Sequence, residues 1–264
     1  MRKTVSLLLV LLLVASALLF ASCRKQQPLM PAEKLQRAID ATQACDALDM
    51  TTDMTIGVSV TGISMEIPMH MDVKVKGAQS DSPVASVDMS MEMLGMTMDI
   101  PMYIEGEWVY TTMLGESYKA KATSDDTDYT QMAQSFVNDL PAELLEGKEM
   151  TVNADGSESV TVDVPPESFA QLFTGALQLA GDTAGTSDDA GSATVKEATV
   201  TYTLKDGLIR KCDMAFSMTV VEDGVQLEMS VQASCTYNAF GDDVVITPPE
   251  GYLDYPEIDA DLLE

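Results

Sequence analysis

Two stretches of ten residues decide the fold of this chain: GISMEIPMHM at residues 62–71 and GMTMDIPMYI at residues 95–104. They align without a gap at an offset of 33 residues, and apolar and polar side chains alternate in both. Alternation with a period of two is typical of a β-strand that buries one face. The stretches therefore predict two copies of one hairpin within an antiparallel meander, because two copies are too few for a solenoid.

Each copy follows a predicted two-residue turn, Thr61-Gly62 in the first and Leu94-Gly95 in the second. These turns fix which residues face one another, and every predicted pair on one face is apolar, which supports the register. The predicted pairs are Val60 with Ile63, Val58 with Met65, Ile56 with Ile67, Met54 with Met69, Met93 with Met96, Met91 with Met98, Met89 with Ile100 and Val87 with Met102.

Pro68 and Pro101 occupy equivalent positions in the two copies and fall on the polar face. A proline cannot donate a ladder hydrogen bond, so we expect a sheet edge or a bulge near each of them. Bulges bend a sheet, and the meander should therefore be curved.

A further hairpin signal, Asp223-Gly224, joins Cys212–Val221 to Val225–Tyr237 and places Cys212 opposite Cys235. Two interpretations of these cysteines stay open: a disulfide, which an oxidising compartment would allow, or two buried thiols packed as small apolar groups. Cys45 has no obvious partner, and a third possibility is that it bonds Cys212 or Cys235 instead. The same register pairs Met214 with Ala233, Phe216 with Val231, Met218 with Met229 and Val220 with Leu227.

Upstream of that hairpin, Lys205-Asp206-Gly207 suits a three-residue loop with a bulged glycine, which would place Val200 opposite Cys212. Helical spacing of apolar residues marks residues 31–48, 128–145 and 166–180. The predicted fold class is α+β: a curved antiparallel β-sheet, a half-barrel meander, with helices packed on its concave face. The predicted segments are a signal peptide at 1–22, a lipidated N-terminus and linker at 23–31, one domain at 32–250 and a solvated acidic tail at 251–264.

The N-terminus carries Arg2 and Lys3, an apolar run over residues 7–20, and then Phe20-Ala21-Ser22-Cys23. An apolar run of this length is typical of a signal peptide rather than of a membrane-spanning helix. Its end resembles a lipobox, which implies diacylglycerol on Cys23 and cleavage before it. The alternative is an ordinary secretory signal with a chance cysteine. We expect an extracytoplasmic protein anchored to the cell membrane by acyl chains.

Composition excludes several classes of function. The 42 acidic and 15 basic residues give a formal net charge of −27, which excludes a nucleic-acid-binding surface. A single histidine argues against a His-rich metal site and a His-based triad. The chain has no G-x-S-x-G, H-E-x-x-H or P-loop motif, so we expect that it is not an enzyme and has no cofactor. We also expect a monomer.

Twelve of the 19 methionines lie between Met50 and Met113, and most project to the apolar face of the meander. Three interpretations compete: a packed core, the lining of a cavity for an apolar ligand, and a soft-metal site for Cu(I). The single histidine, His70, points to the opposite face. The residues predicted to line a ligand cavity are Met65, Met69, Val87, Met89, Met91, Met98 and Met102.

Three further motifs carry a family resemblance: YIEGEWVY at 103–110, VTYTLKDG at 200–207 and VITPP at 245–249. With the order of elements, they make the chain similar to the lipoprotein-carrier superfamily, which includes the LolA-like fold and the LppX/LprG-type cell-wall lipid carriers, and closest to uncharacterised Gram-positive lipoproteins of that shape. The resemblance implies a half-barrel with a helix-covered concave face and, in some members, a cavity for acyl chains.

The leading hypothesis is therefore a membrane-anchored, non-enzymatic lipoprotein that binds or carries a lipid or similar amphiphile. One alternative is a structural or interaction module of the cell envelope without a ligand. The other is a methionine-rich Cu(I)-binding protein.

Overall fold

The structure, a computed structural model, describes residues 29–80, 82–93, 95–113, 115–122, 142–166, 168, 193–222 and 225–258. The chain divides into two compact units, Met1–Met30 and Pro31–Glu264, and every element given below belongs to the second. The predicted signal peptide, Cys23, and nearly all of the predicted helices at 128–145 and 166–180 lie outside the described residues. No helix among the described residues is long and apolar enough to span a membrane.

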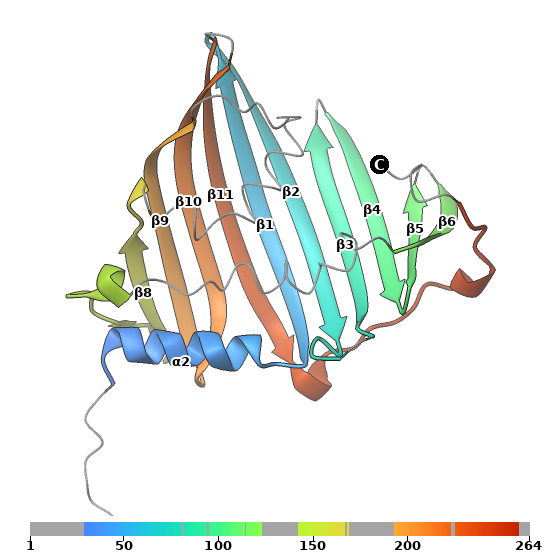
Figure 1. The fold of residues 1–264 in the computed structure, drawn as a ribbon, viewed down its shortest axis with the longest axis horizontal. Coiled ribbons are helices and arrows are strands. Elements are labelled where there is room, and N and C mark those ends of the chain that lie inside the picture. Colours follow the sequence, from blue (N-terminus) through green and yellow to red (C-terminus); the bar gives the residue numbers. More distant parts are fainter. Residues whose placement is uncertain are drawn as a thin grey trace, which may run out of the picture. The chain divides into compact units, whose positions relative to one another are not determined.

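One antiparallel sheet of eleven strands dominates the described residues (Figure 1). Its order is β6-β5-β4-β3-β2-β1-β11-β10-β9-β8-β7, so two meanders meet where β1 pairs with β11. The described part is mostly β, and the open sheet is neither closed nor strongly curled, which corrects the predicted half-barrel. The strands are β1 (Ala47–Val60), β2 (Ile63–Lys76), β3 (Val84–Met93), β4 (Met96–Glu105), β5 (Trp108–Met113), β6 (Glu116–Lys121), β7 (Thr151–Val152), β8 (Glu158–Asp163), β9 (Ala193–Lys205), β10 (Leu208–Glu222) and β11 (Val225–Phe240).

The predicted registers of three hairpins are confirmed pair by pair: β1–β2, β3–β4 and β10–β11. In the first, Thr61 and Gly62 both have positive φ, 50° and 87°. That conformation is a type I′ turn, whose twist matches that of the flanking strands. A two-residue turn allows only one register for its hairpin. Turn position and alternation were therefore enough to predict which residues face one another.

The predicted register between β9 and β10 is wrong, by one residue next to the turn and by two residues at Cys212. Lys205 faces Leu208 across a two-residue turn, and Cys212 faces Tyr202 rather than Val200. The turn residue Asp206 adopts a φ of 56°, which Asp tolerates better than most residues, so no bulged glycine is needed. The ladder is instead irregular between Ile209 and Lys211, and again between Ser217 and Met218. Because a shift of two residues preserves side-chain alternation, the apolar face is unchanged.

Both repeated prolines stand where the pairing between hairpins ends, as predicted. The β2–β3 ladder stops at Met69 and the β4–β5 ladder stops at Met102, in each case the residue after the proline. The carbonyl of Pro101 accepts a 2.9 Å hydrogen bond from the Thr111 hydroxyl. Hairpins β1–β2 and β3–β4 consequently extend beyond the region where they pair with each other.

The helix α2 (Pro31–Gln43) packs against β9 and β10. Its buried residues Leu35, Ala38, Ile39 and Thr42 have the spacing of one helix face. The Thr42 hydroxyl accepts a buried 2.9 Å hydrogen bond from the backbone N–H of Ile209 in β10. Burying a side chain such as Leu35 contributes about 1.5–3 kcal/mol, so this face secures the helix.

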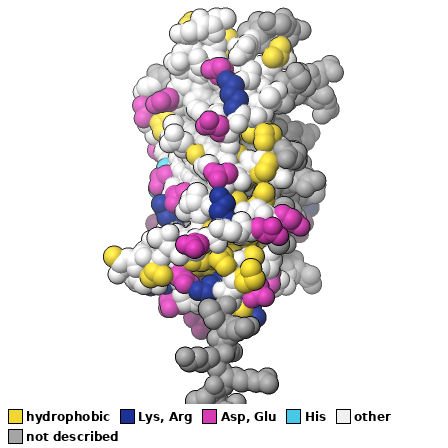
Figure 2. Space-filling model, turned by 90° about the vertical axis from the view of Figure 1, so that its left-hand side faces the viewer, with side chains coloured by type: hydrophobic (Ala, Val, Ile, Leu, Met, Phe, Trp, Pro, Cys, Tyr) yellow, Lys and Arg dark blue, Asp and Glu magenta, His cyan; other side chains and the backbone are white. Residues whose placement is uncertain are grey.

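The β7–β8 end of the sheet carries ion pairs. Lys34 of α2 contacts Glu158 at 2.7 Å, Lys148 contacts Asp163 at 3.0 Å, and Lys205 contacts Asp155 at 3.3 Å. Figure 2 shows this side of the molecule, with acidic and basic side chains next to one another. Exposed pairs add little stability, but charges at a short edge strand hinder edge-to-edge association.

Residues 252–258, part of the expected solvated tail, instead lie against β4, β5 and β6. The backbone N–H of Lys119 donates to Pro256, and that of Ile258 donates to Lys119, both at 2.9 Å. The Tyr252 ring lies 5.2 Å from Tyr103 and 4.9 Å from Tyr110 between centroids, and edge-to-face aromatic pairs of this kind are attractive. This segment therefore covers part of the β6 edge.

Candidate functional site

Methionines of four neighbouring strands stand side by side in one row across the apolar face. Met54 in β1 faces Met69 in β2, Met69 faces Met91 in β3, and Met91 faces Met98 in β4. Residues directly opposite in an antiparallel ladder have Cβ atoms about 4.5–5.5 Å apart. We call these four residues the methionine row. Sequence analysis identified its two outer pairs, but the β2–β3 pairing that joins them has no two-residue turn to reveal it.

The seven predicted lining residues differ in exposure. Val87 is fully buried in the core, whereas Met65 and Met98 expose 38% and 45% of their surface. The other four, Met69, Met89, Met91 and Met102, are half-buried. All seven lie on one face of the sheet, since their registers place them at alternate positions of paired strands.

Exposure of the apolar face increases toward the turns of hairpins β1–β2 and β3–β4. Val73 and Val75 are fully buried near the other end of β2, whereas Ile63 next to the turn is 76% exposed. Met96, next to the turn of β3–β4, is 66% exposed. Exposed apolar surface that gathers on one part of a protein often marks a binding site. The turn-proximal half of this face is therefore the candidate site for an apolar ligand.

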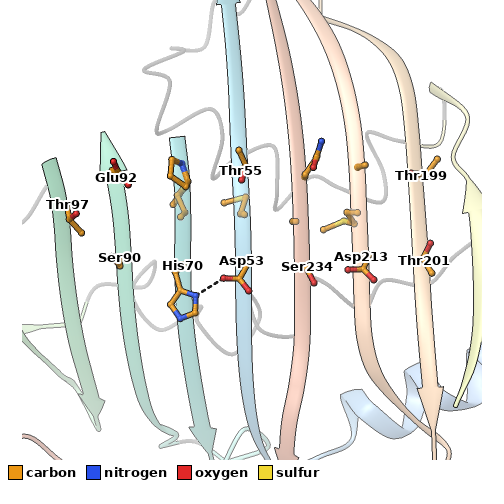
Figure 3. Close-up of a pocket in the computed structure, with 17 residues that line it drawn as sticks. Asp53, Thr55, His70, Ser90, Glu92, Thr97, Thr199, Thr201, Asp213 and Ser234 are labelled. Carbon is orange, nitrogen blue, oxygen red and sulfur yellow. Dashed lines mark hydrogen bonds and ion pairs between the residues drawn. The ribbon is translucent and has the colours of Figure 1, made fainter. Parts of the chain in front are cut away.

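The opposite face carries a groove of about 620 Å³ that crosses the strands from β4 to β9. Figure 3 shows the side chains along it, most of them short and polar. Through the register, Ser90, His70, Asp53, Ser234, Asp213 and Thr201 form one row across six strands. No Lys or Arg is among the described residues that line it, so the groove does not favour an anionic ligand.

His70 lies in this groove, on the face opposite the methionines, as predicted. Its Nδ1 lies 2.7 Å from Asp53 Oδ1 and its Nε2 lies 3.3 Å from Asp72 Oδ2 (Figure 3 shows the first contact). The hydrogen bond to Asp53, helped by the contact with Asp72, raises the pKa of His70 against the opposing effect of burial. Among the described residues, no three His, Cys, Asp or Glu side chains are placed to hold a metal ion.

Cys212 and Cys235 face each other as predicted. In the structure both are buried free thiols, which agrees with the interpretation as small apolar groups and not with a disulfide. Burial raises the pKa of Cys235 to about 12 and that of Cys212 well above its usual value. Cys45, also free and half-buried, has a pKa raised by burial. Because the thiolate is the nucleophile, none of these three groups is activated for chemistry.

A family model described as "Family of unknown function (DUF6612)" matches residues 31–251. No curated protein matches the chain.

Solved structures with a similar arrangement include LprF from Mycobacterium bovis, with 12% identity, a TM-score of 0.43, and coverage of 83% of this chain and 97% of that chain. A LolA superfamily protein from Nitrosomonas europaea has 8% identity and a TM-score of 0.27, covering 83% and 98%. A putative outer membrane lipoprotein-sorting protein domain from Vibrio parahaemolyticus has 12% identity and a TM-score of 0.25, covering 81% and 95%. The chain is similar to these three structures over most of its length and at low identity.

Proposed function

Given that the chain belongs to the DUF6612 family, whose function is unknown, we propose that it binds the acyl chain of an amphiphile on the turn-proximal half of its apolar face. The protein would act outside the cytoplasm, held at the membrane by acyl groups on Cys23, and would carry its ligand without transforming it. The single observation that carries the proposal is the exposure of Ile63, Met65, Met96 and Met98 on one face of two neighbouring hairpins.

Covering the exposed end of this face with an apolar ligand is favourable, because it removes apolar surface from water. Each methylene group moved from water to an apolar surface contributes about 0.8 kcal/mol, so even a partly covered acyl chain would bind measurably. A chain lying across β2 and β4 would contact Met65 and Met98 and reach the half-buried Met69 and Met91 between them. The amphiphile's polar head would stay in water near the hairpin turns.

Methionine suits this role better than the branched residues of the core. Its unbranched side chain has three rotatable bonds and a polarizable sulfur, so it fits ligands of differing shape. The fully buried Val73, Val75 and Val87 form the fixed part of the same face. The face thus combines buried valines at one end with flexible methionines at the other. We expect this arrangement of a site for acyl chains of varied length.

The proposal is tested by titrating the full-length protein, with Cys23→Ser to remove the anchor, with a fluorescent fatty acid. Met65→Gln combined with Met98→Gln makes the contact polar at nearly constant size and should weaken binding at least fivefold. Met30→Gln is the control, because Met30 is 67% exposed and precedes α2. Absence of binding, or equal binding by all three proteins, would refute the proposal and favour an interaction module of the envelope without a ligand.

A further inference from the structure

The methionine row places four thioether side chains next to one another on adjacent strands. Met69 and Met91 occupy its centre, flanked by Met54 on one side and Met98 on the other. We propose that Met69, Met91 and Met98 bind one Cu(I) ion through their sulfur atoms. This site does not depend on the binding of an amphiphile.

The spacing of the row allows three sulfur atoms to converge. Met69, Met91 and Met98 stand directly opposite one another on three adjacent strands, with Cβ atoms about 4.5–5.5 Å apart from one strand to the next. Each side chain has enough rotatable bonds to swing its sulfur toward the middle strand, where Met91 lies. Thioether sulfur atoms brought together in this way suit a soft metal ion such as Cu(I).

The burial of the three side chains suits a soft monovalent cation. Met69 and Met91 are half-buried, whereas Met98 is 45% exposed and leaves a route of entry from solvent. The next position on the same face of β2 is the buried Ile67, so the ion would sit against apolar surface. Cu(I) tolerates this environment because it prefers thioether sulfur to water and oxygen ligands.

The rest of the described chain favours selectivity for a soft ion. At the neighbouring positions of β1, β2 and β3, the polar side chains Asp53, His70 and Ser90 project to the opposite face and line the groove there. No set of three His, Cys, Asp or Glu residues is placed for a metal among the residues that the structure covers. Zn²⁺ and Cu²⁺, which need nitrogen, thiolate or oxygen ligands, should therefore not compete for the row.

A second methionine pair adds sulfur beside the row. Met71 faces Met89 two positions along β2 and β3, on the same face. These two could replace a lost ligand, so a single substitution is a weaker test than a combined one. The decisive variant is accordingly the triple change Met69→Leu, Met91→Leu and Met98→Leu.

The test is an anaerobic titration of the full-length protein, Cys23→Ser, with Cu(I) in competition with the chromophoric chelator bicinchoninate. We expect one Cu(I) per protein, and at least a tenfold weaker affinity in the triple leucine variant. Met96→Leu is the matched control, since Met96 lies on the same face of β4, is 66% exposed and is outside the row. A circular dichroism melt establishes that the leucine variants fold.

Three outcomes would overturn the site: no Cu(I) uptake, uptake unchanged in the triple variant, or uptake that disappears in Cys212→Ser with Cys235→Ser. X-ray absorption gives a second readout, because the proposed site predicts sulfur scatterers alone around copper. Met65 lies outside the row but within the proposed amphiphile site, so Met65→Gln should weaken binding of the fluorescent fatty acid and leave Cu(I) uptake unchanged. Retained Cu(I) uptake in Met65→Gln, beside lost uptake in the triple leucine variant, therefore separates this proposal from the proposed function.

Discussion

At the scale of single residues, the groove histidine is the clearest electrostatic feature. His70 lies between Asp53 on the neighbouring strand and Asp72 on its own strand. Its raised pKa means that the folded protein binds the proton more tightly than the unfolded chain does. The resulting stabilisation is complete below the unfolded pKa of about 6.5 and is lost as the pH rises through the higher folded pKa.

We expect the NMR titration of His70, the only histidine of the chain, to give a pKa above 6.5. Removing the base with His70→Gln should cost about 0.2–1 kcal/mol at pH 5.5, because the pair is half exposed, and much less at pH 8.5. Urea denaturation at the two pH values measures the difference. A titration midpoint at or below 6.5 would contradict the account of this contact.

The buried thiols allow a second prediction at this scale. Cys212 and Cys235 are buried and protonated, whereas Cys45 is half-buried. In the Cys23→Ser protein, purified without reductant, Ellman's reagent should therefore modify at most one thiol quickly and all three after unfolding. Fewer than three thiols in the unfolded, unreduced protein would reveal a disulfide instead.

At the scale of elements, the packing of the helix α2 against β10 can be tested by shortening one buried side chain. Leu35→Ala removes a buried side chain and leaves a cavity, so it should lower the free energy of unfolding by about 2–5 kcal/mol. Arg37→Ala, on the exposed side of the same helix, is the control and should change it by less than about 0.5 kcal/mol. Equal effects in the urea midpoint would mean that α2 does not pack as described.

Some strand registers could be predicted from the sequence and others could not. Alternation and two-residue turns predicted three hairpin registers, because such turns leave no freedom. The β9–β10 register was wrong, since two turn types fit Lys205-Asp206-Gly207 and only backbone geometry separates them. The pairing of β1 with β11 joins strands far apart in sequence, and no local pattern encodes it.

The same limit applies to the candidate site. Sequence placed Met65, Met69, Met91 and Met98 on one face, and the structure agrees. The continuous row was missed because it needs the β2–β3 register across the longer connection at residues 77–83. The groove around His70 was missed as well, because a hollow made by short side chains depends on how seven strands lie together.

At the scale of the whole domain, the two faces of one sheet have separate properties. One face is apolar, fixed by valines at one end and exposed through methionines at the other. The opposite face is polar, and about half of the residues that line its groove have carboxyl or hydroxyl side chains. A net charge of −27 keeps such a protein soluble while its apolar face stays available, since like charges oppose self-association.

Binding of an acyl chain on the turn-proximal half of the apolar face can be followed residue by residue. The most direct measurement is a methyl NMR titration of the protein, labelled at methionine Cε, with a medium-chain fatty acid. We expect the signals of Met65, Met69, Met91 and Met98 to shift together, while those of the buried Met50 and Met218 stay in place. Shifts confined to other methionines, or no shift at saturating ligand, would contradict it.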